Sequence, residues 1–168
     1  MAGMAARALR HLFAASARRL YPIDRLHRIA AAIAQGEATH EGQVCFAVES
    51  SLPIGAVLAG HDARLRAGEV FARLRVWDTE ANNGVLLYLL LADRRIEIVA
   101  DRGLRGAAVD ERHWRAICER MEGGLRTGDP EAAVVGAIGA ISDLLAHAFP
   151  AGPGRAADNE LPDRPRIL

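Results

Sequence analysis

The most apolar stretch of the chain, residues 85–91, restricts the folds that this sequence can adopt. It carries no charge, follows an Asn-Gly pair and precedes an Asp-Arg pair. A short apolar run between turn-forming residues is typical of a strand that is buried on both faces. Because the two residues Asp93 and Arg94 suffice for a tight turn, residues 95–101 are predicted to return antiparallel. We therefore predict a central strand pair, residues 84–92 and 95–101, with polar side chains at its ends.

Helices and one further strand are predicted around this pair. Apolar residues recur at helical spacing over residues 23–40 and 62–76 and in the segments that start at Asp110 and Asp129. Residues 43–51 alternate as a strand does, and both faces of that strand are mostly apolar. The order of elements predicts an α/β fold, a three-layer α/β/α sandwich whose mixed, mostly buried sheet contains the central antiparallel pair. A helical crossover joins the first strand to the central strand, so these two are expected to be parallel.

The chain of 168 residues is long enough for one domain with a sizeable core. Residues 21–149 are expected to form this domain, and residues 150–168, rich in proline and charge, an extended tail. Residues 1–20 hold four arginines and no acid, which predicts a basic arm or helix. A surface helix or a frayed terminus is the favoured interpretation, and contact with anionic lipid is the alternative. No stretch has the character of a signal peptide or a membrane span, so a cytoplasmic location is expected, and peripheral membrane contact is left open.

Composition excludes several classes of chemistry. All 21 Lys-plus-Arg positions are arginine, which excludes a Schiff-base lysine, a P-loop lysine and a lysine general base. The formal net charge is zero, so no overall field favours nucleic acid as a partner. Cys45 and Cys118 lie far apart without metal-ligand spacing, which predicts buried free thiols in a reducing compartment.

Polar side chains at the strand ends fall into two groups. In an antiparallel pair the start of one strand lies beside the end of the other, so one group gathers where the central strand begins. This group, called the Asn83 rim, comprises Asp78, Asn82, Asn83, Asp101, Arg102 and Asp110. The second group, called the Asp93 rim, lies at the opposite end of the strands and comprises Glu49, Ser50, Asp93 and Arg94.

Both rims are candidates for a Ca²⁺ or Mg²⁺ site. These hard cations take oxygen ligands from carboxylates, amides and backbone carbonyls. The candidate metal ligands of the Asn83 rim are Asp78, Asn83, Asp101 and Asp110. A cation there could bind a phosphate or activate a water molecule. Ligands of parallel sheets bind beyond the carboxyl ends of the strands, which favours Glu49 and Asp93 as the alternative rim, so the sequence leaves both open.

Each of these residues also has a purely structural explanation. The turn before the central strand could use the polar groups of Asp78 and Asn83, and Asp110 is placed to cap a helix. Asp93 is an ordinary hairpin-turn residue. Glu49 lies on an otherwise apolar strand, where an arginine could pair with it.

The order of motifs around the strand pair resembles the TPM-domain family, which comprises thylakoid-lumen acid phosphatase-like proteins and bacterial relatives. The motifs are Asn-Asn-Gly-Val-Leu-Leu at residues 82–87, a short turn that contains Asp, Ile-Glu-Ile-Val at residues 96–99 and Arg-Gly-Leu at residues 102–104. The resemblance covers about residues 21–149 and implies an α/β/α sandwich. Many relatives carry a signal peptide and a membrane anchor, so this chain resembles a short soluble branch that has neither.

The resemblance also bears on function. Some plant members are described as acid phosphatases with a calcium site near the acidic rim, which implies a metal-binding role for the four candidate ligands of the Asn83 rim. No nucleophile or general base stands out in this sequence. We therefore expect a non-enzymatic binding or accessory module that acts with a protein partner or a membrane surface. A Ca²⁺- or Mg²⁺-assisted hydrolase of the acid-phosphatase type is the alternative.

Overall fold

The central strand pair belongs to a mixed sheet of four strands in the order β3-β2-β1-β4. The structure, a computed structural model, describes residues 2–105, 109–152 and 160–168. Strand β1 (Gln43–Glu49) pairs in parallel with β2 (Gly84–Leu90), and β2 pairs antiparallel with β3 (Arg95–Ala100). The predicted α/β fold, its mixed sheet and the antiparallel pair are therefore confirmed.

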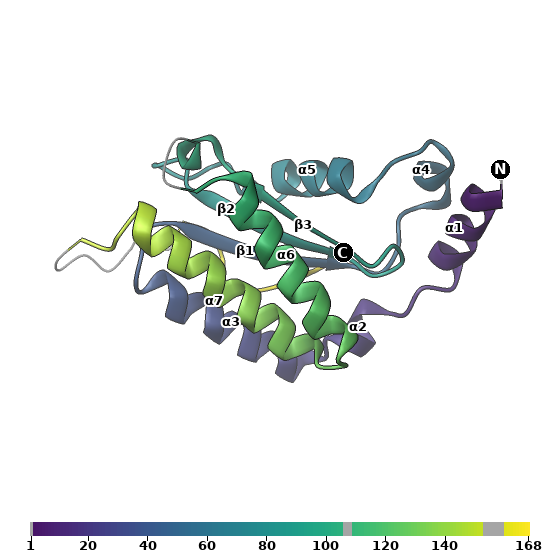
Figure 1. Ribbon diagram of the computed structural model, residues 1–168, viewed down its shortest axis with the longest axis horizontal. Helices are drawn as coiled ribbons and strands as arrows, with labels where there is room; N and C mark the ends of the chain where they lie inside the picture. Colours follow the sequence, from purple (N-terminus) through teal and green to yellow (C-terminus); the bar gives the residue numbers. More distant parts are fainter. Residues whose placement is uncertain (1, 106–108, 153–159) are drawn as a thin grey trace.

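Helices cover both faces of the sheet and so form three layers (Figure 1). On one face lie α3 (Ile23–Glu37), α6 (Glu111–Arg126) and α7 (Pro130–Ala148). On the other face lie α4 (Ile54–Leu58) and α5 (Ala63–Arg73). Every residue of β1 and β2 is buried, as expected for strands that are covered on both sides.

Two apolar clusters, one on each face of the sheet, hold the layers together. Alternate residues of a strand point to opposite faces, so Phe46 and Leu87 pack on the side of α3, α6 and α7, whereas Ala47 and Leu86 pack on the side of α4 and α5. Phe46 also meets Tyr21 edge-on, with ring centroids 5.7 Å apart. Full burial of each large apolar side chain contributes about 1.5–3 kcal/mol, so the apolar strands dominate the stability of the fold.

Three α-helices have an aspartate as N-cap residue. The side chains of Asp62, Asp110 and Asp129 accept hydrogen bonds from backbone N–H groups in the first turns of α5, α6 and α7. These N–H groups have no partner inside their helix, so each cap contributes on the order of 1 kcal/mol. The predicted starts at Asp110 and Asp129 are confirmed.

The C-terminal segment, expected as an extended tail, returns to the sheet. Strand β4 (Arg166–Ile167) pairs in parallel with β1, and Leu161 is buried. The Oε1 atom of Gln43 accepts hydrogen bonds from the backbone N–H groups of Glu160 (3.0 Å) and Leu161 (2.9 Å). Residues 160–168 are thus packed on the domain, and a strand of two residues has no periodicity from which to predict it.

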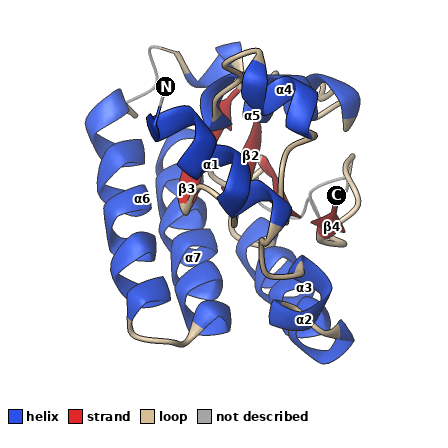
Figure 2. Ribbon diagram, turned by 90° about the vertical axis from the view of Figure 1, so that its right-hand side faces the viewer, coloured by secondary structure: helices blue, strands red, loops and turns tan. Residues whose placement is uncertain are grey.

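The N-terminal segment forms two helices, α1 (Ala2–Leu12) and the short α2 (Ala17–Leu20). Helix α1 packs beside α4 at one end of the molecule (Figures 1 and 2). In the described part of the chain, α7 alone has the length and composition of a membrane-spanning helix, with a mean hydropathy of 1.3 over its most apolar window. Its packing against α3 and α6 is that of a core helix.

Candidate functional site

Asn83 is the most deeply buried member of the Asn83 rim, with 1% of its surface exposed. Its Nδ2 donates a hydrogen bond to the carbonyl of Glu41 (2.9 Å), and its backbone N–H donates to Oγ1 of Thr79 (3.0 Å). Within the described residues, its Oδ1 is buried without a hydrogen-bond partner. An unsatisfied buried oxygen costs about 1–3 kcal/mol, which a bound cation would offset.

Asp101, directly after β3, supplies a second oxygen of this kind. Its Oδ1 accepts a hydrogen bond from the backbone N–H of Arg102 (2.7 Å), whereas its Oδ2 is buried and finds no donor in the described part of the chain. The backbone N–H of Asp101 donates to the carbonyl of Gly84 (2.9 Å), which places Asp101 beside the start of β2. Asn83 and Asp101 therefore bring two acceptor oxygens without donors to one end of the sheet.

Backbone carbonyls crowd the same end of the sheet. A Cβ at Gly103 would lie 2.4 Å from the carbonyl oxygen of Ala81 and 2.5 Å from that of Asn82, so only glycine fits there. Asn82 itself has a φ of 51°, in the left-handed region that asparagine tolerates. Side-chain and carbonyl oxygens are the kinds of donor atom that Ca²⁺ prefers, so the types of residue at this rim match a hard cation.

The other two predicted ligands of the Asn83 rim are engaged elsewhere. Asp78 is exposed and forms an ion pair with Arg75 (2.7 Å). Asp110 caps α6, and its hydrogen bond from the Arg112 guanidinium lowers the pKa of the carboxyl to about 2. Across residues 2–105, 109–152 and 160–168, no three His, Cys, Asp or Glu side chains gather in a possible metal site. Two of the four predicted side chains, Asn83 and Asp101, thus have a buried oxygen that no described group donates to.

At the Asp93 rim, Glu49 is neutralised inside the fold. Arg66 donates from Nε and Nη2 to the two carboxylate oxygens, at 2.9 Å each. The hydroxyl of Tyr88 donates to Oε2 at 2.7 Å, and burial followed by this bond raises the pKa of Tyr88. Glu49 therefore pairs with an arginine, which is the structural role that the sequence suggested for it. Both of its carboxylate oxygens accept hydrogen bonds from neighbouring side chains.

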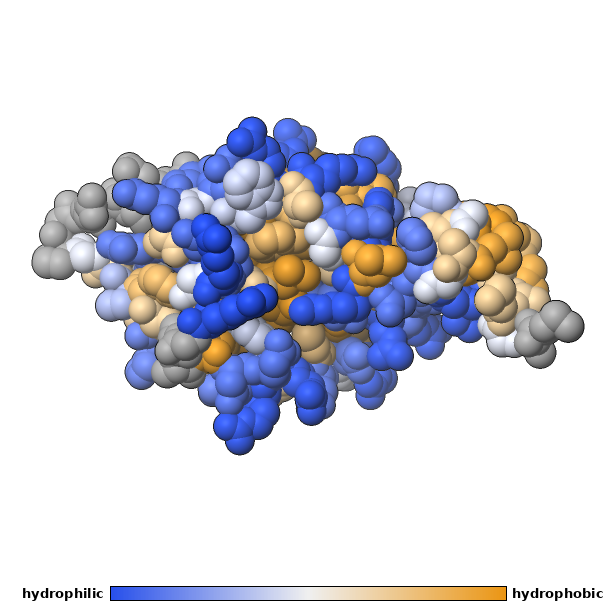
Figure 3. All heavy atoms as spheres, turned by 90° about the horizontal axis from the view of Figure 1, so that it is seen from above, coloured by the Kyte–Doolittle hydropathy of each residue, from blue (hydrophilic) through white to orange (hydrophobic). Residues whose placement is uncertain are grey.

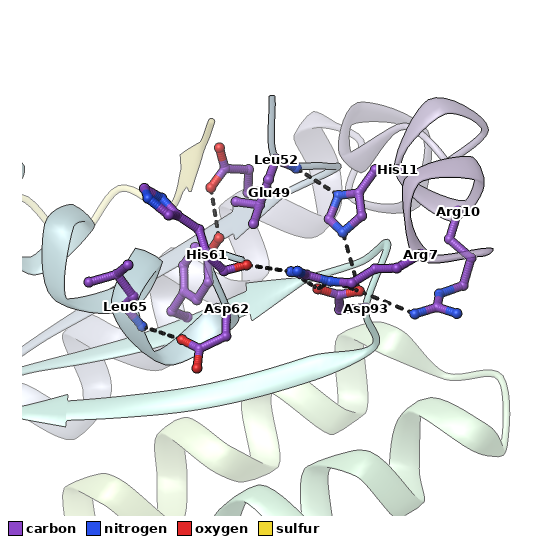
Figure 4. A network of polar contacts seen from close by, with 10 residues as sticks. Arg7, Arg10, His11, Glu49, Leu52, His61, Asp62, Leu65 and Asp93 are labelled. Atoms are coloured by element: carbon purple, nitrogen blue, oxygen red, sulfur yellow. Dashed lines mark hydrogen bonds and ion pairs between the residues drawn. The ribbon is translucent and has the colours of Figure 1, made fainter. Parts of the chain in front are cut away.

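Asp93 is bound by side chains of α1 (Figure 4). Arg7 donates to Oδ2 of Asp93 from Nη2 (2.7 Å) and Nε (3.0 Å) and to the carbonyl of His61 from Nη2 (2.6 Å). Arg10 lies 3.5 Å from Oδ1 of Asp93. We call the group of Arg7, His11 and Asp93 the Asp93 latch, because it fastens the N-terminal helix to the β2–β3 turn.

His11 completes the Asp93 latch from a fully buried position. Its Nδ1 accepts a hydrogen bond from the backbone N–H of Leu52 (2.9 Å), so the neutral ring carries its proton on Nε2, which lies 3.2 Å from Oδ1 of Asp93. Burial alone would raise the pKa of Asp93, but the hydrogen bonds and charge of Arg7, together with the hydrogen bond of His11, outweigh it and hold this pKa below its usual value of 3.8. Asp93 is therefore ionised and paired at neutral pH.

Helix α1 turns an apolar face to solvent, opposite the face that carries the Asp93 latch. We call this surface the α1 face and define it by Leu9 and Leu12 of the helix and by Phe13 directly after it, which are 55%, 61% and 83% exposed. Apolar side chains gather at the end of the molecule where α1 lies (Figure 3). Single exposed apolar residues are common on proteins, but adjacent large ones on one helix mark an interaction surface.

The sequence did not predict which residues bind the carboxylates of Glu49 and Asp93. Arg7 precedes Asp93 by 86 positions, and Glu49 lies 17 positions from Arg66 and 39 from Tyr88. Helical spacing connects residues three or four apart, so no local pattern joins such pairs. The one relevant feature of the sequence was the group of four arginines in residues 1–20, which suggested contact with lipid and gave no indication of a bond to Asp93.

The two thiols offer no reactive nucleophile at neutral pH. Cys45 is buried and Cys118 half-buried, both are free, and burial raises the pKa of each thiol to about 11. A thiol with such a pKa is almost entirely protonated at pH 7, whereas the thiolate is the attacking species. The prediction of free thiols is confirmed.

A mixed sheet between two helical layers, with an oxygen-rich rim at the start of its central strand, defines a small α/β/α domain. The family model described as TPM domain matches residues 24–144. Since this match covers most of the chain, the protein belongs to the TPM-domain family. The resemblance drawn from the motifs around the strand pair is confirmed.

A solved structure shares this fold. The NMR structure of the BA42 protein from the psychrophilic bacterium Bizionia argentinensis superimposes with a TM-score of 0.74. The two sequences are 23% identical, and the match covers 86% of this chain and 93% of BA42. At this identity the likeness shows the fold alone. A search of curated proteins finds no match.

Proposed function

We propose that this protein is a non-enzymatic module that binds anionic membrane surfaces through α1. The observation that carries the proposal is the α1 face. An amphipathic helix at a protein surface normally turns its apolar side inward. Here the polar groups Arg7 and His11 point inward to Asp93, while Leu9, Leu12 and Phe13 point outward. A helix held in this way presents an apolar surface that an interface between lipid and water would cover.

The charges around the α1 face favour an anionic bilayer as its partner. Arg10, Arg18 and Arg19 are exposed, and residues 1–20 contain no acidic side chain. Basic side chains near the surface of an anionic membrane each contribute about 1 kcal/mol to binding. Apolar insertion and charge attraction therefore act on the same segment, which is the combination that peripheral helices use.

The state of the Asp93 rim supports a binding role over catalysis. A general base or a metal ligand needs a lone pair that is available to the substrate or the ion. The carboxylate of Glu49 is bound by Arg66 and Tyr88. The carboxylate of Asp93 is bound by Arg7 and His11. Both thiols are protonated at neutral pH. None of these groups is free to act as a nucleophile or base.

Vesicle co-sedimentation tests the proposal. The full chain should bind vesicles that mix phosphatidylcholine with phosphatidylglycerol, and it should bind pure phosphatidylcholine much more weakly. Leu9→Gln with Phe13→Gln should weaken binding by about tenfold or more, because burial of each large apolar side chain is worth about 1.5–3 kcal/mol.

The control uses two large apolar residues away from α1 that are each about half exposed. Leu65 and Trp77 are 50% and 47% exposed, so Leu65→Gln with Trp77→Gln removes similar apolar surface elsewhere. This variant should bind vesicles as the parent chain does. Absence of binding by the parent chain, or equal losses in both variants, would reject α1 as a membrane-binding element.

A second candidate function is favoured by the Asn83 rim. Asn83 and Asp101 would hold Ca²⁺ or Mg²⁺ through the two buried oxygens that have no donor among the described residues. A bound cation of this kind can polarise a phosphate oxygen and activate water. A hydrolase of the acid-phosphatase type would release phosphate from an aryl phosphate with Ca²⁺, lose this activity in EDTA and lose it in Asp101→Asn. Release that survives both treatments would exclude the rim as the active site.

A further inference from the structure

A second basic surface lies beside the N-terminal helices, where the C-terminal segment returns to the sheet. A groove of about 340 Å³ runs between the corner of α2 and α3 and the segment that ends in β4. The lining side chains come from residues 18–26 and 164–167, which are remote in the sequence. Figure 2 shows β4 and the C-terminus on the right of the view, above α3 and α2.

The groove carries positive charge that the fold does not neutralise. Arg18, Arg164 and Arg166 line it, and none of its other lining residues in the described part of the chain is acidic. All three are exposed, and none forms an ion pair with another described residue. The larger polar groove beside α1 differs, because Arg7 there is bound to Asp93, and Asp62 and Glu97 add further negative charge. The groove at the C-terminus is thus the better candidate for an anion.

The remaining walls of the groove are apolar. They comprise Tyr21, Pro22, Ile23, Leu26, Pro165 and Ile167. Ile23 is 52% exposed, whereas Tyr21 is fully buried and directs its hydroxyl to the carbonyl of Pro130 (3.4 Å). The tyrosine therefore presents carbon to the groove and uses its polar atom elsewhere. Arginines over an apolar floor match a ligand that has a negative head and an apolar chain.

We propose that this groove binds the phosphate headgroup of an anionic glycerophospholipid, with the arginines on the phosphate and part of the lipid's apolar portion on Ile23, Leu26 and Ile167. Arginine donates in a fork that fits phosphate oxygens, and its hydrogen bonds to an anion are about twice as strong as neutral ones. The inference rests on the proposed membrane function, since it names the lipid group that the docked protein would hold. Helix α2 follows α1 after four residues, so the groove and the α1 face lie on neighbouring segments of the chain.

Soluble short-chain lipids separate this groove from the α1 face. Dihexanoyl phosphatidic acid, kept below its micelle concentration, should produce saturable amide shifts at Ile23, Leu26 and Ile167 in the full chain. Dihexanoyl phosphatidylcholine should bind more weakly, because its headgroup carries no net charge. Inorganic phosphate should bind at least about tenfold more weakly than the phosphatidic acid, since it lacks the apolar portion.

Charge removal at the groove should abolish most of this binding. Arg164→Gln with Arg166→Gln should weaken binding of the short-chain phosphatidic acid by about tenfold or more. The matched control is Arg73→Gln with Arg115→Gln, since both arginines are exposed and neither lines the groove. The control variant should bind as the parent chain does.

Three outcomes would overturn the assignment. They are the lack of any saturable shift, equal binding by the two double variants, and equal affinity for inorganic phosphate, which would make the groove a site for free phosphate. The variant Leu9→Gln with Phe13→Gln separates the two proposals. If it and the parent chain both fail to bind vesicles while the short-chain lipid still binds, the groove stands and α1 docking fails. If vesicles bind through α1 while the short-chain lipid does not bind, the groove assignment fails alone.

Discussion

Arg7 in the first helix and Asp93 in the β2–β3 turn form a bidentate ion pair across 86 positions of sequence, with the shortest contact at 2.7 Å. The pair is largely shielded from water, since 20% of the Arg7 side chain and 10% of the Asp93 side chain are exposed. With His11 it fastens α1 to the end of the sheet at which β1 and β2 finish. The general site for ligands in parallel sheets is thus occupied by the protein's own N-terminus.

Asp93→Asn should destabilise the protein by about 1–3 kcal/mol at pH 7, because Arg7 then lacks its counter-charge in a mostly buried position. The pKa of Asp93 lies below its usual value of 3.8. Its stabilisation is therefore fully present above that value and is lost as the pH falls below it. Urea denaturation at pH 7 and at acid pH measures both effects.

The control for the Asp93 latch is Asp143→Asn. Asp143 is exposed on α7 and forms no ion pair with another described residue, so its replacement should change the free energy of unfolding by less than about 0.5 kcal/mol. Equal effects of the two substitutions would show that the latch adds no stability.

Glu37→Gln should stabilise the protein at pH 8. Glu37 is 7% exposed, and burial, followed by the nearby Asp163, raises its pKa to about 8 while a hydrogen bond from Val44 N–H opposes the rise. The folded chain retains a proton that the unfolded chain releases, so stability falls as the pH rises from about 4.5 to 8. Glutamine carries no such charge and can still accept from Val44, so the gain at pH 8 should reach a few kcal/mol, roughly 2–4.

Denaturation curves at pH 5 and pH 8 measure this gain as a difference between Glu37→Gln and the parent chain. The difference removes the contribution of His40, whose pKa is lowered by burial and which therefore titrates in both proteins. Glu119→Gln, on the exposed side of α6, serves as the control and should show no pH-dependent gain. A Glu37→Gln variant that gains nothing at pH 8 would show that Glu37 is not protonated in the fold.

Gly84→Ala should destabilise the protein by about 3 kcal/mol or more. A Cβ at Gly84 would lie 1.9 Å from the carbonyl oxygen of Val76, and backbone cannot move aside as a flexible side chain can. Gly123→Ala in α6 is the control, since its Cβ would meet nothing within 4 Å and alanine favours helix by up to about 1 kcal/mol. The melting temperature should therefore fall in Gly84→Ala and rise in Gly123→Ala. A Gly84→Ala variant as stable as the parent chain would refute the close approach of Gly84 to Val76.

Ca²⁺ should raise the melting temperature by about 5 °C at roughly 100 times its dissociation constant if the Asn83 rim holds the ion. Asp101→Asn should remove most of this shift, because it keeps a cap acceptor for Arg102 but loses the charge. Asp78→Asn should retain the shift, since Asp78 pairs with Arg75 at the surface. If Asp78→Asn also lost the shift, Asp78 would be a ligand as well, as the sequence predicted.

Short-range sequence patterns were sufficient to predict the central strand pair and the starts of two helices. The uncharged run of β2, the two-residue turn after it and the aspartates before α6 and α7 each act over a few residues, so they could be interpreted without the fold. The same kind of reasoning placed Asn83 and Asp101 at one end of the sheet, because the antiparallel pairing of two adjacent strands leaves little freedom.

Pairings between remote segments were decided by the tertiary structure alone. The sequence determined which residues are polar at the strand ends, but not that Arg7 would bind Asp93, that Arg66 and Tyr88 would bind Glu49, or that β4 would return beside β1. Such contacts depend on how packed layers bring distant groups together, and burial then requires each charge to find a partner. Only the tertiary structure shows that one oxygen each of Asn83 and Asp101 is buried without a donor in the described part of the chain, and that the apolar face of α1 points outward.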